Sequence, residues 1–276
     1  PAYSNRNLPD TYHLSGMKNL LKLVFIVGLP VLAGSCRHYY YMPNTPLMPA
    51  FQNRHDAVLN VALCDQSGTE IQAAYSPLKY TAVLLNHMSV DRKFASTDER
   101  AKGRLTEGGL GFYYGKHPWS VHLLGGYGGG FVENGYGLLP GNGNGYAKSR
   151  LKLEQYFIQP GFVLQTSHLK LGLVFRHVWL HYYKGDSDVI SIDQNELNAL
   201  KAIEERTPFS FTELGVTLGF RLRPFTFSYN VVSIIDTRST YRDMHFKNSN
   251  RSIMVSLALN ELWRKREAPG PTPGNK

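Results

Sequence analysis

The chain has 276 residues, and its formal net charge of +9 is scattered along the sequence rather than gathered into a basic stripe. Scattered positive charge argues against a nucleic-acid-binding protein and leaves anionic lipids and acidic glycans as candidate partners. Two cysteines argue against a disulfide-stapled scaffold, whereas 17 tyrosines, 26 glycines and a mean hydropathy of −0.28 favour a β-rich protein.

The N-terminal region has the layout of an export signal. We interpret residues 1–16 as an upstream extension and Met17 as the natural start. Residues 17–35 then form a signal peptide, in which a basic start precedes an apolar run that Pro30 interrupts. The run is too short to span a bilayer, which takes about 20 apolar residues, and it ends in small residues before Cys36.

The sequence Ala33-Gly34-Ser35-Cys36 resembles the lipobox of bacterial lipoproteins, and its looser form resembles the lipobox of Bacteroidota. The resemblance implies cleavage before Cys36 and a covalent lipid on its sulfur, and we expect no other cofactor. The alternative is a buried apolar segment with an incidental cysteine.

Residues 36–55 are predicted to form a lipidated, extended arm, because prolines at positions 43, 46 and 49 disfavour a helix. Tyr39, Tyr40 and Tyr41 suit a membrane interface, where an aromatic ring contacts both lipid and water. The alternative is that the arm enters the following domain as a small plug.

Residues 56–263 read as a β-barrel, because apolar and polar or small residues alternate along ten segments. The clearest is 208–223, where Val216, Leu218 and Phe220 alternate with threonine and glycine. The ten segments are 56–65, 69–77, 79–90, 104–115, 118–132, 149–165, 168–183, 208–223, 224–236 and 250–262. Most are as long as a tilted membrane strand of about 9–11 residues.

The connections between these segments alternate in length. Short turns such as 115–118 and 223–224 alternate with long polar stretches such as 133–148 and 184–207. This pattern is typical of an antiparallel, up-and-down transmembrane β-barrel with short periplasmic turns and long external loops. We therefore predict an all-β barrel of about ten strands, with eight or twelve as alternatives, in the outer membrane. Both termini would be periplasmic, and the anchor would be a lipid. A soluble sandwich or a lipocalin-like barrel is the competing fold.

Three further features complete the prediction. Asp193 and Glu196 resemble a capping box, so one long loop should hold a short helix. Trp119, Trp179 and Trp263 are candidate interfacial aromatics, with Trp263 ending the last strand. The tail 264–276 reads as disordered.

Charged residues occur on the polar face of the strands, where they should point into the lumen. A narrow barrel does not leave such charges unpaired, so we expect an internal ion-pair network. Its predicted members are Glu107, Lys170, Arg176, Glu213 and Arg221. The network either fills the lumen or lines a small selective pore, and filling is the favoured interpretation because ten strands enclose little space.

Other motifs favour structure over chemistry. The glycine run 125–130 lacks the Lys-Ser/Thr of a phosphate loop. His177 and His181 would lie about 13 Å apart on one strand, too far to share a metal, so no metal site is predicted.

The predicted function is a non-enzymatic outer-membrane barrel lipoprotein, structural or an accessory subunit of an envelope complex. Its expected partners are outer-membrane lipids and other envelope proteins. The alternatives are a narrow porin-like channel and a barrel hydrolase, for which the outer rim offers His177, Asp186 and His245 among others.

Overall fold

The computed structural model describes residues 39–65, 68–93, 100–137, 146–188, 194–235 and 246–264. These residues all belong to one compact unit, Cys36–Lys276. The predicted upstream extension, signal peptide, lipidation site Cys36 and tail beyond residue 264 lie outside the described residues. No described helix is both long enough and apolar enough to cross a membrane.

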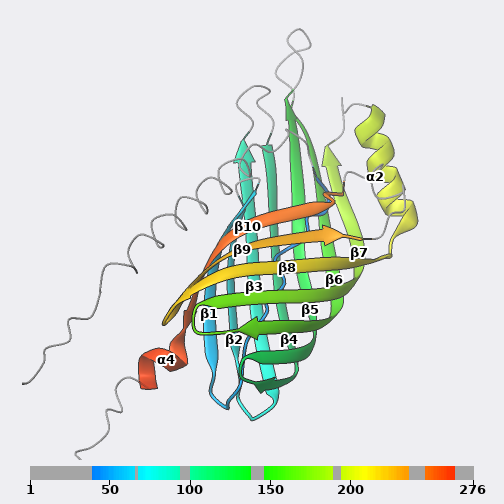
Figure 1. Cartoon of the computed structure of the whole chain (residues 1–276). Coiled ribbons are helices and arrows are strands. Elements are labelled where there is room, and N and C mark those ends of the chain that lie inside the picture. Colours follow the sequence, from blue (N-terminus) through cyan, green and yellow to red (C-terminus); the bar gives the residue numbers. More distant parts are fainter. Residues whose placement is uncertain are drawn as a thin grey trace, which may run out of the picture. The chain divides into compact units, whose positions relative to one another are not determined.

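The described chain forms a closed barrel of ten antiparallel strands (Figure 1). Each strand pairs with its neighbours in sequence, and β1 pairs with β10 to close the sheet. The strands are β1 (Ala57–Cys64), β2 (Gly68–Tyr75), β3 (Thr81–Lys93), β4 (Arg100–Lys116), β5 (Trp119–Gly137), β6 (Tyr146–Gln165), β7 (Leu169–Asp188), β8 (Phe209–Leu222), β9 (Phe225–Ile234) and β10 (Ser249–Ala258). The predicted up-and-down barrel of ten strands is confirmed.

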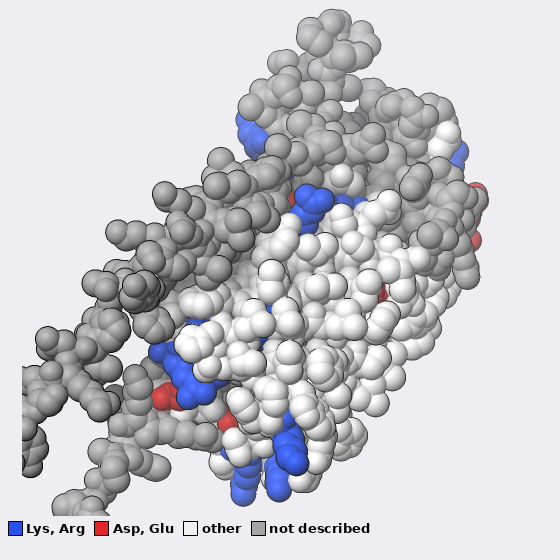
Figure 2. Space-filling model, in the orientation of Figure 1, with Lys and Arg blue, Asp and Glu red and all other residues white. Residues whose placement is uncertain are grey.

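The barrel is apolar outside and largely polar inside, which is the reverse of a soluble barrel. In β8, Val216 and Leu218 are 45% and 54% exposed, whereas Thr217 between them is 4% exposed and faces the lumen. Figure 2 shows a wall almost free of charged side chains, with lysine, arginine and acidic residues gathered towards its two ends. An apolar surface of this extent needs a cover other than water.

Short and long connections lie at opposite ends of the barrel. The connections after β2, β4, β6 and β8 are tight, and we call their side the turn end. The connections after β3, β5, β7 and β9 are longer, and we call their side the loop end. The helix α2 (Gln194–Arg206) lies at the loop end, where the sequence predicts a helix.

The end of β10 differs from the prediction. The strand stops at Ala258, and the helix α4 (Leu259–Arg264) follows at the turn end, so Trp263 belongs to a helix rather than to the last strand. The side chain of Asn260 in this helix donates to Asp56 Oδ1 at 2.8 Å, next to the start of β1.

The glycine run of β5 makes room for large side chains on the neighbouring strands. A Cβ at Gly128 would lie 2.7 Å from Glu107 Cγ, and one at Gly126 would lie 2.5 Å from Phe157 Cζ. Both distances are shorter than a van der Waals contact. The run is therefore a packing feature of the wall, as its sequence indicates.

Candidate functional site: the occupied lumen

The lumen holds the N-terminal arm, which we define as residues 39–55. The arm runs from the loop end, where Tyr40 Oη lies 3.2 Å from Ser149 Oγ, to the turn end, where Asn53 O accepts from Tyr113 Oη at 2.9 Å. Tyr40 and Tyr41 are 0% and 2% exposed. The expectation of an arm outside the barrel is wrong, and so is the assignment of these two tyrosines to a membrane interface. The plug alternative describes the structure.

The wall holds the arm by its backbone. An extended chain without a strand partner leaves its carbonyl groups unpaired, and inside a barrel these groups need other donors. Lumen side chains supply them: Tyr182 Oη donates to Tyr40 O (2.7 Å), Asn250 Nδ2 to Pro43 O (2.8 Å), Gln72 Nε2 to Thr45 O (2.5 Å) and Gln159 Nε2 to Leu47 O (2.8 Å). In return, Thr45 N donates to Glu70 Oε1 at 2.9 Å. The arm is therefore bound at successive residues along its path.

A buried charge cluster lies midway along the arm. The Arg176 guanidinium, 1% exposed, pairs with Glu107 and lies 3.7 Å from Glu213 Oε2. Asn44 of the arm donates to Glu107 and accepts from Arg176, and Tyr41 Oη donates to Glu213 Oε1 at 2.6 Å. The arm is thus part of the network that neutralises the lumen.

The remaining two predicted members of the network lie elsewhere. Arg221 pairs with Glu261 of α4 at the turn end and donates to Thr166 O at 3.1 Å. Lys170 is 7% exposed and makes no hydrogen bond or ion pair with any described residue. The predicted single network is therefore split, because Lys170 and Arg221 stand near the turn-end rim whereas Arg176 stands deep in the lumen.

The wall is shaped to the arm as well as bonded to it. A Cβ at Gly172 would lie 2.5 Å from Met48 Sδ, and one at Gly115 would lie 2.1 Å from Phe51 O. Lumen-facing glycines at these positions leave the space that the arm occupies.

Contacts at the loop end fix the first residues of the arm. Tyr41 forms a parallel bridge with Phe246, and Lys247 N donates to Tyr41 O at 2.8 Å. The Lys247 side chain pairs with Asp65, which follows β1. Burial lowers the pKa of the Lys247 ammonium, and the Asp65 carboxylate opposes this shift.

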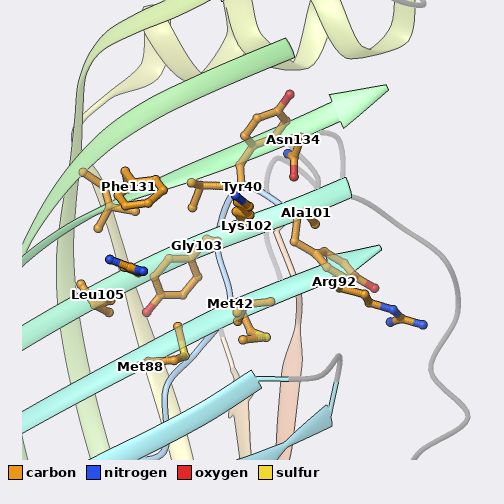
Figure 3. A pocket seen from close by; sticks show the side chains of 16 residues that line it. Tyr40, Met42, Met88, Arg92, Ala101, Lys102, Gly103, Leu105, Phe131 and Asn134 are labelled. Atoms are coloured by element: carbon orange, nitrogen blue, oxygen red, sulfur yellow. The ribbon is translucent and has the colours of Figure 1, made fainter. Parts of the chain in front are cut away.

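A small apolar pocket lies beside these residues, between the arm and strands β3 to β5. Its volume is about 60 Å³. Figure 3 shows Met42 of the arm beside Met88 of the wall and Tyr40 of the arm nearer to Asn134, whereas the Arg92 side chain points away from this group. The loop end of the lumen is thus nearly filled.

A larger cavity of about 400 Å³ lies at the turn end. The arm lines it with Met48 and Phe51, and the barrel lines it with Lys170 and Arg221. Of these two cavities among the described residues, the one at the turn end is the larger.

The predicted interfacial aromatics have varied positions. Trp119 lies at the turn end, its ring 5.6 Å from that of Tyr114, and Trp179 is 44% exposed on the outer wall. Tyr39 is half-buried at the loop end. The side chain of Trp263 is not among those described, and Cys36 lies outside the described residues.

Residues outside the predicted set contribute most of the arm contacts. Asn44 and Glu70 had the right chemistry, but neither belongs to an interpretable motif. Glu70 does share the alternation of β2 with Gln72, which is a signal that could have placed it in the lumen. Glu261 was hidden by the assignment of residues 250–262 to a strand.

The residues proposed for a hydrolase do not assemble a site in the described part of the chain. His177 contacts Thr212 Oγ1 through Nδ1 at 2.9 Å and Ser210 Oγ through Nε2 at 3.0 Å. These three side chains lie on the outer wall of β7 and β8, where the backbone amides are paired in the ladder. A developing oxyanion has no pair of donors there. His245 lies outside the described residues, and the described residues hold no group of three or more potential metal ligands.

No protein-family model matches the chain, and no curated protein matches it. Among solved structures, the chain is similar to the KdgM porin, with 7% sequence identity, a TM-score of 0.34 and coverage of 74% of this chain and 98% of the porin. A structure of the KdgM porin in complex with disordered oligogalacturonate gives 6% identity and a TM-score of 0.32, with the same coverage. At this level of similarity we take neither function nor ligand from the porin.

Proposed function

We propose that this protein is a narrow outer-membrane channel whose own N-terminal arm is the plug. The observation that supports this proposal most strongly is the arm itself. It is a separate segment that is bound in the lumen by side chains of the wall. A barrel that serves only as an anchor can fill its interior with wall residues. Here Gly172 and Gly115 instead leave space that the arm occupies.

The apolar outer wall supports placement in a membrane. Exposed leucine, valine and phenylalanine on every other position match the lipid-facing band of a transmembrane barrel. A closed ten-strand sheet also leaves no unpaired edge in hydrocarbon. Short turns at one end and longer loops at the other favour the outer membrane, with the turn end in the periplasm.

The gating step would be a shift of the arm that opens the lumen while the barrel stays intact. The wall strands are held by continuous ladders, whereas the arm is held by separate side-chain bonds and one bridge. Separate bonds to side chains exchange for bonds to water more readily than a sheet ladder does. The arm is therefore the element whose movement costs least.

A reversible crosslink tests this proposal. Thr45 Oγ1 of the arm lies 3.0 Å from Ser252 Oγ of β10, so the double variant T45C/S252C should form a disulfide that fixes the arm. The variant is made with C64S, because Cys64 is a buried free thiol. Conductance of the full chain is recorded in planar bilayers, and the single variant C64S is the matched control.

We expect C64S to show conductance steps, the oxidised double variant to show none, and a reductant to restore them. Conductance steps in the oxidised double variant would mean that ions do not pass where the arm lies. Absence of conductance steps from C64S and from both the oxidised and the reduced double variant would reject the channel.

The bonds that hold the arm favour one other candidate, a structural or accessory outer-membrane protein. Arg176, Glu107 and Asn44 form a connected cluster that rigidifies the lumen. A barrel locked in this way would present its loops to a partner without conducting. Co-purification of a stable partner from gently solubilised membranes, together with the absence of conductance, would favour this candidate.

A further inference from the structure

The turn-end cavity is lined by a largely buried lysine that has no counter-charge among the described residues. Lys170 is 7% exposed and lines the cavity of about 400 Å³. It makes no hydrogen bond or ion pair with the described residues. A lysine ammonium is rarely buried without a partner, because desolvation of the charge is not compensated.

The other charges around the cavity do not serve Lys170. The charged group that acts on it is another cation, Arg221. The acidic Glu261 is paired with Arg221 and lies 3.9 Å from Arg223. The second acid, Asp56, accepts hydrogen bonds from the backbone amides of residues 52 and 53 and from Asn260. Both acids are thus engaged, and the positive charge of Lys170 remains.

A second buried nitrogen group stands near Lys170. His122 is 4% exposed, and neither of its ring nitrogens has a hydrogen-bond partner among the described residues. It is close enough to Lys170 for the lysine charge to act on it. His122 does not line the cavity, so the argument for an absent acceptor there rests on Lys170.

We propose that the turn-end cavity is a binding site for a small organic anion, a phosphate monoester or a carboxylate, whose charged group pairs with Lys170. The volume is within the range of about 300–1,000 Å³ that is usual for ligand sites. Met48 and Phe51 of the arm supply an apolar side for the body of the ligand. Glu261 lines the same cavity, and its Oε2 has no hydrogen-bond partner among the described residues, so we expect it to accept from a hydroxyl group on the ligand.

The site does not depend on whether the barrel conducts. Its phosphate could come from a soluble monoester or from the phosphodiester headgroup of an anionic lipid, since both present a negatively charged phosphate. Glycerol phosphate serves as the soluble probe, because it carries a phosphate monoester and hydroxyl groups. Inorganic phosphate is the probe that lacks hydroxyl groups. Nanodiscs of phosphatidylglycerol, compared with nanodiscs of phosphatidylcholine, test the lipid source.

Binding is measured by isothermal titration calorimetry on the full chain in a neutral detergent. The variant K170M removes the charge and keeps the apolar stem. The control K116M removes an exposed lysine at the same end of the barrel. We expect wild type and K116M to bind glycerol phosphate with equal affinity, and K170M to bind at least tenfold more weakly. Inorganic phosphate should bind more weakly than glycerol phosphate if the hydroxyl contact to Glu261 forms.

If the soluble probes do not bind, thermal unfolding in nanodiscs tests the lipid headgroup as the ligand. An anionic headgroup in the site should raise the unfolding temperature of wild type and K116M in phosphatidylglycerol relative to phosphatidylcholine, with a smaller rise for K170M. Equal responses of K170M and wild type to every probe would overturn the proposal. So would a wild type that responds to neither the soluble anions nor the anionic lipid.

Discussion

Arg176 is the residue on which the electrostatics of the lumen depend. Its guanidinium is shared by Glu107 and Glu213, and its flat face lies 4.3 Å from the Phe157 ring centroid. Burial of two carboxylates is tolerated only because a cation and several donors surround them. The arm contributes two of those donors through Tyr41 and Asn44.

The variant R176M should therefore be strongly destabilised. It leaves Glu107 and Glu213 buried without a cation, and loss of one partner from a buried ion pair costs about 3–5 kcal/mol. Urea unfolding in detergent, followed by tryptophan fluorescence, measures the change. The control R100M removes an exposed pair with Asp91, whose side chains are 51% and 53% exposed, and should leave the midpoint unchanged. Similar midpoints for R176M and R100M would contradict the buried cluster.

Gly115 provides a steric test of the arm. A Cβ there would lie 2.1 Å from Phe51 O, which belongs to the backbone, so G115A forces the arm away from the wall at the turn end. Overpacking of this kind costs about 1–3 kcal/mol. Gly108 of the same strand is exposed and has no atom within 4 Å of its Cβ position, so G108A is the matched control.

We expect G115A to lower the urea midpoint and to increase channel openings relative to G108A. Equal behaviour of the two variants would show that Phe51 does not lie against β4.

The arm is an element without secondary structure, and its order depends on side chains from many strands. The amide of Thr45 is its clearest reporter, because this N–H donates to both carboxylate oxygens of Glu70, at 2.9 and 3.2 Å. An amide bonded inside the lumen should exchange with solvent slowly.

Hydrogen exchange measures this protection directly. We expect the Thr45 amide to be protected in the wild type, and E70A to increase its exchange rate at least tenfold because the acceptor is lost. The variant E70Q keeps an acceptor oxygen at the same position and should keep most of the protection. Fast exchange of Thr45 in the wild type would place the arm outside the barrel.

Alternation along the strands made the barrel predictable. In β8 every second residue is large and apolar, so both the strand and its outward face follow from the sequence. The helix α2 was equally visible from its capping box. The arm was not, because Asn44 and Thr45 lie between prolines in a segment without any period. Only their hydrogen-bond partners on the wall, such as the acceptor Glu70, show where they belong.

The charge network shows the same limit. Parity along each strand correctly placed Lys170, Arg176 and Arg221 in the lumen, since all three are buried. The alternation of a strand shows which face a residue is on, but it does not show how far along the barrel axis the residue lies. That position decides which charged residues it can pair with. Arg221 lies near the rim and pairs with Glu261, whose helix was read as part of a strand.

The path of the arm places the described ends of the chain at opposite ends of the barrel. Tyr39 lies at the loop end, whereas α4 lies at the turn end. This differs from the expectation that both termini are periplasmic, which assumed that the chain enters β1 directly from the turn side. If the turn end is periplasmic, Tyr39 lies at the external end of the barrel. A lipid on Cys36 would then be attached three residues before that point in the sequence.

Cysteine labelling tests this orientation. The variants Y39C and N198C place thiols at the loop end, the second of them on α2, and K79C places one in the turn between β2 and β3. Intact cells are treated with a membrane-impermeant maleimide. We expect Y39C to react as N198C does, and K79C to react only after permeabilisation. The reason is that the arm runs the length of the lumen and places Tyr39 at the loop end, opposite the turn that holds Lys79. The unsubstituted chain reports any reaction of the native thiols. If Y39C instead reacts only when K79C reacts, the arm does not traverse the barrel, and a plug anchored on the external side is ruled out.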